Sequence, residues 1–110
     1  MNEIKEITDK ILEFRDSRDW EKFHEIKNLL LGINIEVSEL QSLFLWDKGE
    51  NEVNKEEVKN EIADIFIYLI YICDKLDINL QDSVINKLEI HKKHYPIDIS
   101  KGKTTKYNKL

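Results

Sequence analysis

The segment NLLLGINIEVSELQSLFLW, residues 28–46, carries the pattern that decides the fold of this chain. At about 100° per residue, its apolar side chains gather on one side of a helix, and Glu36 falls inside that apolar arc. Glu39 follows three residues later, at the edge of the same face. A carboxylate in an apolar face loses hydration, which is unfavourable unless a partner compensates it. No basic residue occurs in the segment, so we expect the partner to be a distant Lys or Arg, or a cation. The apolar positions of this stripe are Ile26, Leu29, Ile33, Val37, Leu40 and Phe44.

The same arrangement recurs once, between residues 58 and 76. Glu61 lies at the edge of a second apolar stripe, and Asp64 follows three residues later. If the two stripes pack together, four carboxylates meet, and like charges raise each other's pKa. Hard divalent cations with oxygen ligands compensate such a cluster. We therefore predict a metal site for Mg²⁺, or Mn²⁺ as a substitute, made by Glu36, Glu39, Glu61 and Asp64. The second stripe consists of Val58, Ile62, Ile65, Leu69, Ile72 and Leu76.

The composition favours long helices joined by short loops. The 110 residues include three Gly and one Pro, and 35% of them are charged. We predict an all-α four-helix bundle with helices over 3–17, 26–46, 55–76 and 80–94. Asn54 and Asn79 are the expected N-caps of the last two helices, with Glu57 completing a capping box, and Pro96 is expected to end the fourth. Residues 1–96 form the predicted helical domain and residues 97–110 a basic tail, which we expect to be ordered only by a ligand or partner.

The predicted third helix is apolar nearly all round, which indicates a second buried face. Ile67, Ile70 and Tyr71 point away from its main stripe. In so short a chain, we expect these residues to form a dimer interface.

Charge and cysteine content limit the location and the partners. Cys73 is the single cysteine, so no intrachain disulfide can form, which favours a reducing compartment. The sequence has neither a signal-peptide pattern nor an apolar run long enough to span a bilayer, so we expect a soluble, cytoplasmic protein. Residues 87–110 carry seven Lys and two acids, while the rest of the chain is acidic. The basic end is either a solvated tail or a segment that folds back to bind an anion near the acidic cluster. Because the acidic body repels polyanions, we do not expect nucleic acid as a partner.

Two tryptophans, Trp20 and Trp46, bear on the chemical class of the substrate. Mg²⁺ is usually held by protein carboxylates together with substrate phosphates. Trp20 lies in the irregular segment 16–25, where it either folds onto the core or forms an aromatic wall. Trp46 is expected near Glu39 on the second helix, two turns further on, where it either caps the core or flanks the metal. Together with the Lys-rich end, these features favour a nucleotide.

These residues resemble those of the MazG-like all-α nucleoside triphosphate pyrophosphohydrolases, and most closely the dCTP pyrophosphatase branch. The resemblance covers about residues 12–107 in order. It rests on F-R-x-x-R-D-W from Phe14 to Trp20, F-H-x-x-K-N-L from Phe23 to Leu29, E-x-x-E-L-x-x-x-F-x-W from Glu36 to Trp46, E-x-A-D-x-x-x-Y from Glu61 to Tyr68, and Y-P at Tyr95-Pro96.

The resemblance implies Mg²⁺-dependent hydrolysis of a (deoxy)nucleoside triphosphate to the monophosphate and pyrophosphate. It makes the four carboxylates the metal ligands and catalytic residues, and Glu39 is our candidate for orienting or deprotonating the attacking water. It also implies a homodimer or a dimer of dimers. The predicted substrate-binding residues are Trp20, His24, Lys27, Trp46, Tyr68, Lys87 and Lys92.

Two positions depart from the dCTP branch and bear on base preference. A base-pocket His of that branch falls at Ile11, and a helix-four Asn falls at His91. His24 is the nearest polar candidate for contacting the edge of the base. We expect a preference for pyrimidine deoxynucleotides that is weaker than in the strict dCTP enzymes. The alternative function is a non-catalytic helical module that binds nucleotides or a partner helix.

Overall fold

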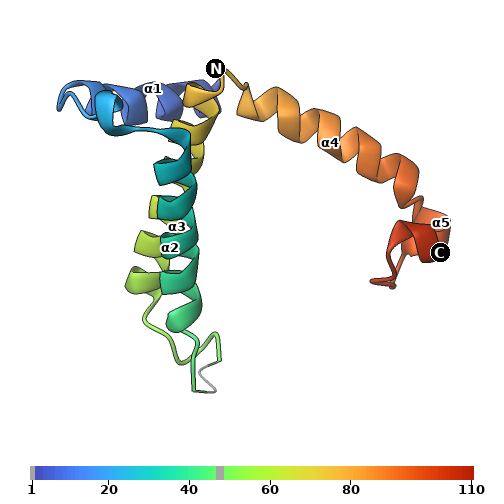
Figure 1. Ribbon diagram of the computed structural model, residues 1–110. Helices are drawn as coiled ribbons and strands as arrows, with labels where there is room; N and C mark the ends of the chain where they lie inside the picture. The colour runs from blue at the N-terminus through green and yellow to red at the C-terminus, as the bar shows by residue number, and fades with distance from the viewer. Residues whose placement is uncertain (1, 47–48) are drawn as a thin grey trace. The chain divides into compact units, whose positions relative to one another are not determined.

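The computed structural model describes residues 2–46 and 49–110 (Figure 1). The described residues form five α-helices and two short 3-10 helices, with no β-strand among them, so the predicted all-α class is confirmed. The chain divides into two compact units, Met1–Ile78 and Asn79–Leu110. The elements are α1 (Glu3–Asp16), η1 (Glu21–Phe23), α2 (Ile26–Ser42), α3 (Lys55–Lys75), α4 (Leu80–His94), α5 (Ile97–Ser100) and η2 (Tyr107–Lys109).

Asparagine caps fix where α3 and α4 begin. Asn54 Oδ1 accepts hydrogen bonds from the backbone N–H groups of Glu56, at 2.9 Å, and Glu57, at 3.4 Å. Asn79 Oδ1 accepts one from the backbone N–H of Asp82 at 3.0 Å. Each oxygen satisfies a donor that the first helical turn leaves unpaired. Both helices therefore begin at the caps that the sequence predicts.

The helix α2 ends at Ser42, four residues before the predicted end at Trp46. The Ser42 hydroxyl donates to the backbone carbonyl of Glu39 at 2.6 Å, and the N–H groups of residues 43–45 bond three residues back rather than four. This tighter turn interrupts the α-helical ladder. Trp46 has a φ of 61°, in the left-handed region. The interpretation that placed Trp46 beside Glu39 on the helix is therefore wrong. Residues 47 and 48 of the predicted stop lie outside the described residues.

Within the first unit, α2 and α3 lie side by side, and α1 runs across the end where α2 begins and α3 ends (Figure 1). Ile70 of α3 is 2% exposed, and Tyr71 and Cys73 are also buried. Because α1 and α2 both contact α3, this helix has two neighbours within its own chain. The interpretation of Ile70 and Tyr71 as dimer-interface residues is therefore wrong, while dimerisation itself stays a prediction.

Most residues of the two predicted apolar stripes on α2 and α3 are buried or half-buried. A Cβ added at Gly32 would overlap the ring of Tyr68, so this glycine leaves room for that side chain of α3. Val37 and Ile62, both members of the predicted stripes, are exposed. Glu36 follows Gly32 by one turn and is half-buried, which agrees with its predicted place inside the apolar arc.

The second unit folds its tail back onto its own helix. The ring of Tyr107 stacks on His94 with centroids 3.9 Å apart, and the Tyr107 N–H donates to Tyr95 Oη at 3.3 Å. These contacts come from the chain itself, so the expectation that only a ligand or partner orders residues 97–110 is not met. The functional division at residue 96 stays a prediction.

None of the helices that the structure describes is long and apolar enough to cross a membrane. Cys73 has a free thiol, and burial raises its pKa. The cytoplasmic location stays a prediction.

Candidate active site

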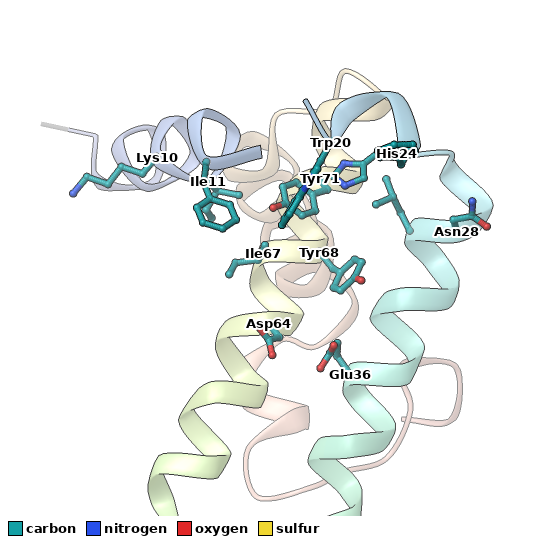
Figure 2. A pocket seen from close by; sticks show the side chains of 13 residues that line it. Lys10, Ile11, Trp20, His24, Asn28, Glu36, Asp64, Ile67, Tyr68 and Tyr71 are labelled. Carbon is teal, nitrogen blue, oxygen red and sulfur yellow. The ribbon is translucent and has the colours of Figure 1, made fainter. Parts of the chain in front are cut away.

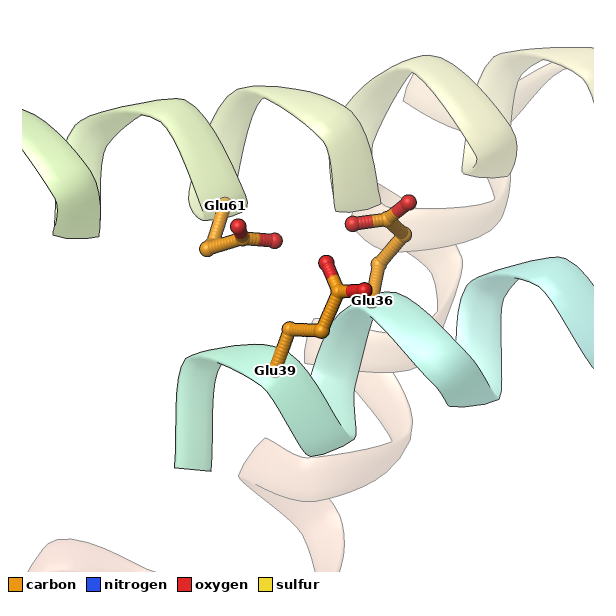
Figure 3. Close-up of side chains that lie close together, drawn as sticks. All are labelled: Glu36, Glu39 and Glu61. Carbon is orange, nitrogen blue, oxygen red and sulfur yellow. The ribbon is translucent and has the colours of Figure 1, made fainter. Parts of the chain in front are cut away.

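Three carboxylates from two helices converge in the first unit. Glu36 and Glu39 of α2 point toward Glu61 of α3 (Figure 3). One oxygen from each of the three lies within 4.8 Å of the others. The i, i+3 spacing puts the two acids of α2 on one side of that helix, and α3 lies along α2 with Glu61 opposite them.

The crowding changes the protonation of Glu36. Burial raises its pKa to about 7, and the neighbouring carboxylates of Glu61, Glu39 and Asp64 add to the effect because they disfavour a further negative charge. At neutral pH the cluster therefore holds a proton readily, unless positive charge replaces it.

The cluster has the chemistry of a hard-cation site. Glu36 Oε2 and Glu61 Oε2 are both inaccessible to solvent and have no hydrogen-bond partner. A buried acceptor without a partner is destabilising. Carboxylate oxygens are the ligands that hard divalent cations prefer. The residues present therefore fit a divalent cation.

Asp64 lies close to this cluster but outside it. Its side chain is exposed, and it faces Glu36 across a pocket (Figure 2). Its charge contributes to the raised pKa of Glu36. The structure thus gathers three of the four predicted carboxylates tightly and places the fourth on the adjoining pocket wall.

The pocket has a volume of about 690 Å³ and lies between α1, η1, α2 and α3 (Figure 2). Glu36 and Asp64 make its acidic end. Its other end is mainly apolar and aromatic, with side chains from α1, α2, α3 and the segment between α1 and α2. The lining residues are Lys10, Ile11, Phe14, Trp20, Phe23, His24, Asn28, Leu29, Glu36, Asp64, Ile67, Tyr68 and Tyr71.

The aromatic end is built from rings in contact. Phe14 and Trp20 meet edge to face with centroids 5.7 Å apart, and His24 lies 4.5 Å from Tyr71 between centroids. His24 Nδ1 is buried without a hydrogen-bond partner. Burial lowers the pKa of His24, and the nearby positive charge of Arg15 lowers it further. A neutral imidazole therefore brings one unpartnered polar atom to the mainly apolar end of the pocket.

The predicted substrate-binding residues divide into three groups. Trp20, His24 and Tyr68 line the pocket. Lys27 and Trp46 are exposed and are not among its lining residues, and Trp46 is 92% exposed. Lys87 and Lys92 belong to the second unit, where Lys92 pairs with Glu89 at 2.8 Å.

Sequence reasoning missed several pocket residues. Tyr71 was assigned to the outer face of the third helix, yet it lines the pocket with Tyr68. The spacing of Asp64, Tyr68 and Tyr71, at i, i+4 and i+7, is the signal that places all three on one helical face. The burial of Arg15, which is not one of the lining residues, was also missed, although Arg15 belongs to the F-R-x-x-R-D-W motif.

A family model described as the MazG-like family matches residues 31–110 of this chain. The match includes all four predicted carboxylates, from Glu36 to Asp64. It thus spans most of α2, the whole of α3, and the second unit.

Several proteins that are similar to this chain are named pyrophosphatases. The protein dCTP pyrophosphatase 1 of Mus musculus is 35% identical over 106 residues, and that of Homo sapiens is 32% identical over 105 residues. Each alignment covers 89% of this chain, which spans only 62% of the length of these curated relatives. A solved pyrophosphatase from Archaeoglobus fulgidus DSM 4304 is 41% identical, with a TM-score of 0.79, and the match covers 87% of this chain and 94% of that chain.

Proposed function

This chain belongs to the MazG-like family, and on that premise we propose that it hydrolyses nucleoside triphosphates to the monophosphate and pyrophosphate. One observation carries the proposal: three carboxylates lie within 4.8 Å of one another beside a pocket whose far end is aromatic. Such a pocket suits a ligand with a polyphosphate at one end and a planar base at the other. The names of the similar pyrophosphatases support the same reaction class.

The cation would be Mg²⁺, with Mn²⁺ as a substitute, and Glu36, Glu39 and Glu61 would hold it, with Asp64 beside them. When bound, a divalent cation supplies positive charge that offsets the charge of the phosphates. The preference for Mg²⁺ follows from a ligand set made only of carboxylates.

The reaction breaks the bond between the α-phosphorus and its bridging oxygen, with a water oxygen forming the new bond to phosphorus. Glu39 is our candidate for accepting the proton of that water, because it is the exposed member of the cluster. Glu36 is half-buried in the cluster, so we assign it to holding the cation rather than to contacting the water. Pyrophosphate is the leaving group.

The base would lie among the aromatic side chains, with Trp20 as one wall. Stacking on rings tolerates any base and contributes about 1–3 kcal/mol. Discrimination needs a hydrogen bond to the base edge, and the unpartnered Nδ1 of His24 is the group we assign to it. With Ile11 in the same pocket, we propose a pyrimidine deoxynucleotide preference that is weaker than in strict dCTP enzymes.

We further propose that the active protein is a homodimer or a dimer of dimers. A shallow groove along α2 includes the exposed apolar residues Leu31 and Ile35 and reaches Glu39 of the carboxylate cluster. Exposed apolar surface of this kind favours association.

Lys87 and Lys92 remain our candidates for contacting the phosphates of the substrate.

The test is pyrophosphate release from a panel of dNTPs and NTPs, with Mg²⁺, with Mn²⁺ and with a chelator. We expect turnover only with a divalent cation and the fastest turnover with pyrimidine deoxynucleotides. Glu57→Gln, on the exposed first turn of α3, is the matched control for substitutions in the cluster. Tight nucleotide binding without turnover under any condition would instead support the non-catalytic binding module.

A further inference from the structure

We propose that Arg15 is a positioning residue of this pocket, and that its buried ion pair with Asp74 holds the aromatic end in register with the carboxylates. The inference rests on the proposed function only in taking the pocket as the substrate site. The ion pair and its contacts stand on geometry alone.

Arg15 is the only buried charged residue among those that the structure describes, and it is 6% exposed. Its Nε donates to Asp16 Oδ1 at 2.8 Å, and its Nη1 donates to Asp74 Oδ2 at 2.8 Å. Burial works against the charged guanidinium, but the bonds to Asp16 and Asp74 outweigh it and raise the pKa above its ordinary value. The side chain thus joins the end of α1 to the last turns of α3.

The backbone of the same residue reaches the pocket. The Arg15 carbonyl accepts a hydrogen bond from the N–H of Trp20 at 3.2 Å, across the turn that follows α1. The neighbouring Phe14 meets the ring of Trp20 edge to face. One residue therefore connects two pocket walls: α1 with Trp20 on one side, and α3 with Tyr71 on the other.

Apolar packing alone holds α1 weakly. Ile4 and Ile7, on the N-terminal half of α1, are both more than a third exposed. A planar guanidinium that donates to two carboxylates fixes distance and orientation in a way that a few apolar contacts do not. We infer that the position of the α1 wall depends on this ion pair rather than on the core.

The first experiment compares Arg15→Met with Lys5→Met in the dNTP assay. Lys5→Met is the matched control, because it removes an ion pair of α1 that lies on the surface, between Lys5 and Asp9. We expect Arg15→Met to raise KM by roughly tenfold with kcat within about twofold, since it disturbs binding and not the carboxylates. Lys5→Met should change neither constant. An unchanged KM in a folded Arg15→Met protein would overturn the proposal.

The second experiment does not use turnover. The chain has two tryptophans, so a Trp46→Phe background leaves Trp20 as the single reporter. In that background, Arg15→Met should shift the Trp20 emission to longer wavelength and increase its quenching by acrylamide, while Lys5→Met should not. Unchanged emission and quenching would refute the positioning role, even if no nucleotide were ever hydrolysed. Conversely, a shifted Trp20 in a protein without pyrophosphohydrolase activity would refute the proposed function alone.

Asp74→Asn keeps the proposal falsifiable if Arg15→Met does not fold. This variant retains an oxygen acceptor for Nη1 and removes the charge, and Arg15 keeps its bond to Asp16. We expect a smaller change of KM and of Trp20 emission in the same direction. No change in either readout would overturn the proposal.

The pKa of His24 gives a third readout, which reports both the charge of Arg15 and the burial of the imidazole. Burial, Arg15 and Lys75 lower the pKa of His24, and Glu21 raises it. In an NMR titration, Arg15→Met should raise the pKa of His24, whereas Lys5→Met should leave it unchanged. A His24 pKa that is the same in both variants would place Arg15 away from the aromatic end.

Discussion

At the scale of single residues, Glu36 shows how position decides chemistry. The glutamates of the exposed first turn of α3 have ordinary surroundings, whereas Glu36 has a buried oxygen and two carboxylates beside it. Its pKa near 7 follows from burial first and from these neighbours second. The same crowding that disfavours ionisation makes the position suitable for a cation.

The raised pKa of Glu36 predicts a pH dependence of stability. Between its ordinary pKa of 4.5 and the folded value of about 7, the folded state binds more protons than the unfolded state. The free energy of unfolding of the metal-free protein should therefore fall as pH rises through that window. Glu36→Gln should flatten this fall, and at pH 8 it should stabilise the metal-free protein by on the order of 1 kcal/mol or less. Thermal melts from pH 4 to 8 in chelator test this, and an identical pH profile in both proteins would contradict it.

Substitutions of the acids should separate cation binding from turnover. Glu36→Gln should abolish turnover and weaken Mg²⁺ binding, because Glu36 belongs to the tight cluster. Asp64→Asn should also abolish turnover, with a smaller effect on Mg²⁺ affinity, since Asp64 is exposed and lies outside that cluster. Calorimetric Mg²⁺ titrations and kinetics measure the two effects, and circular dichroism should show unchanged helix. Near-wild-type activity in either variant would remove that residue from the site.

At Trp46, an effect on nucleotide binding is easy to distinguish from an effect on protein stability. Because its side chain is 92% exposed, Trp46→Ala should leave the melting temperature nearly unchanged. Alanine keeps a Cβ at the positive φ, so the comparison isolates the ring. We expect KM to rise for every accepted nucleotide, with little change in the ratios among nucleotides. An unchanged KM would exclude Trp46 from substrate binding.

At the scale of elements, the structure depends on where helices begin and how closely they approach. The caps at Asn54 and Asn79 set the first turns of α3 and α4, and Gly32 leaves room for the Tyr68 ring between α2 and α3. The acids of the cluster meet because Glu36 and Glu39 share one face of α2, and α3 packs along that helix.

Asn54→Ala should weaken α3 at its start. The Asn54 side chain satisfies two backbone donors, and loss of such a cap typically costs about 1 kcal/mol. We expect urea unfolding at a lower midpoint with an unchanged m value. Asn60→Ala, at an exposed interior position of the same helix, is the control and should be neutral or slightly stabilising. Equal midpoints for the two variants would mean that the cap is not what stabilises this end.

At the scale of the whole molecule, the distribution of exposed apolar residues bears on assembly. Leu31 is 60% exposed on α2, and Ile35 follows one turn later on the same groove. Ile70, by contrast, lies in the core of the first unit. The structure therefore moves the candidate dimer face from α3 to α2.

Leu31→Glu and Ile70→Glu should have different effects, the first on oligomerisation and the second on folding. Leu31→Glu places a charge on an exposed face, so it should dissociate the oligomer and leave the helical signal intact. Ile70→Glu buries an unpaired charge in the core, so it should unfold the first unit. Sedimentation velocity and circular dichroism distinguish the two results. A wild-type protein that sediments as a monomer at micromolar concentration would rule out the dimer.

Local patterns determined much of this protein without the structure. The all-α class, the start of α2, the caps of α3 and α4 and the full extent of α4 follow from periodicity, Asn caps and Pro96, which act over a few residues. The acidic pairs on α2 and α3 were likewise visible as i, i+3 spacings. The physical reason is that capping and helical periodicity involve residues only a few positions apart, so they can be recognised in the sequence.

Only the tertiary structure decided which faces meet. The two predicted stripes were expected to be buried throughout, but Val37 and Ile62 are exposed, and the ring of Tyr68 lies against Gly32. The sequence also did not predict that α2 ends at Ser42. Nor did it predict the burial of Arg15 against Asp74, which is 59 residues away in the chain. Helical periodicity gives each helix an angle about its own axis but no angle relative to its neighbour. That second angle depends on side-chain shapes and long-range ion pairs, which exist only once the chain has folded.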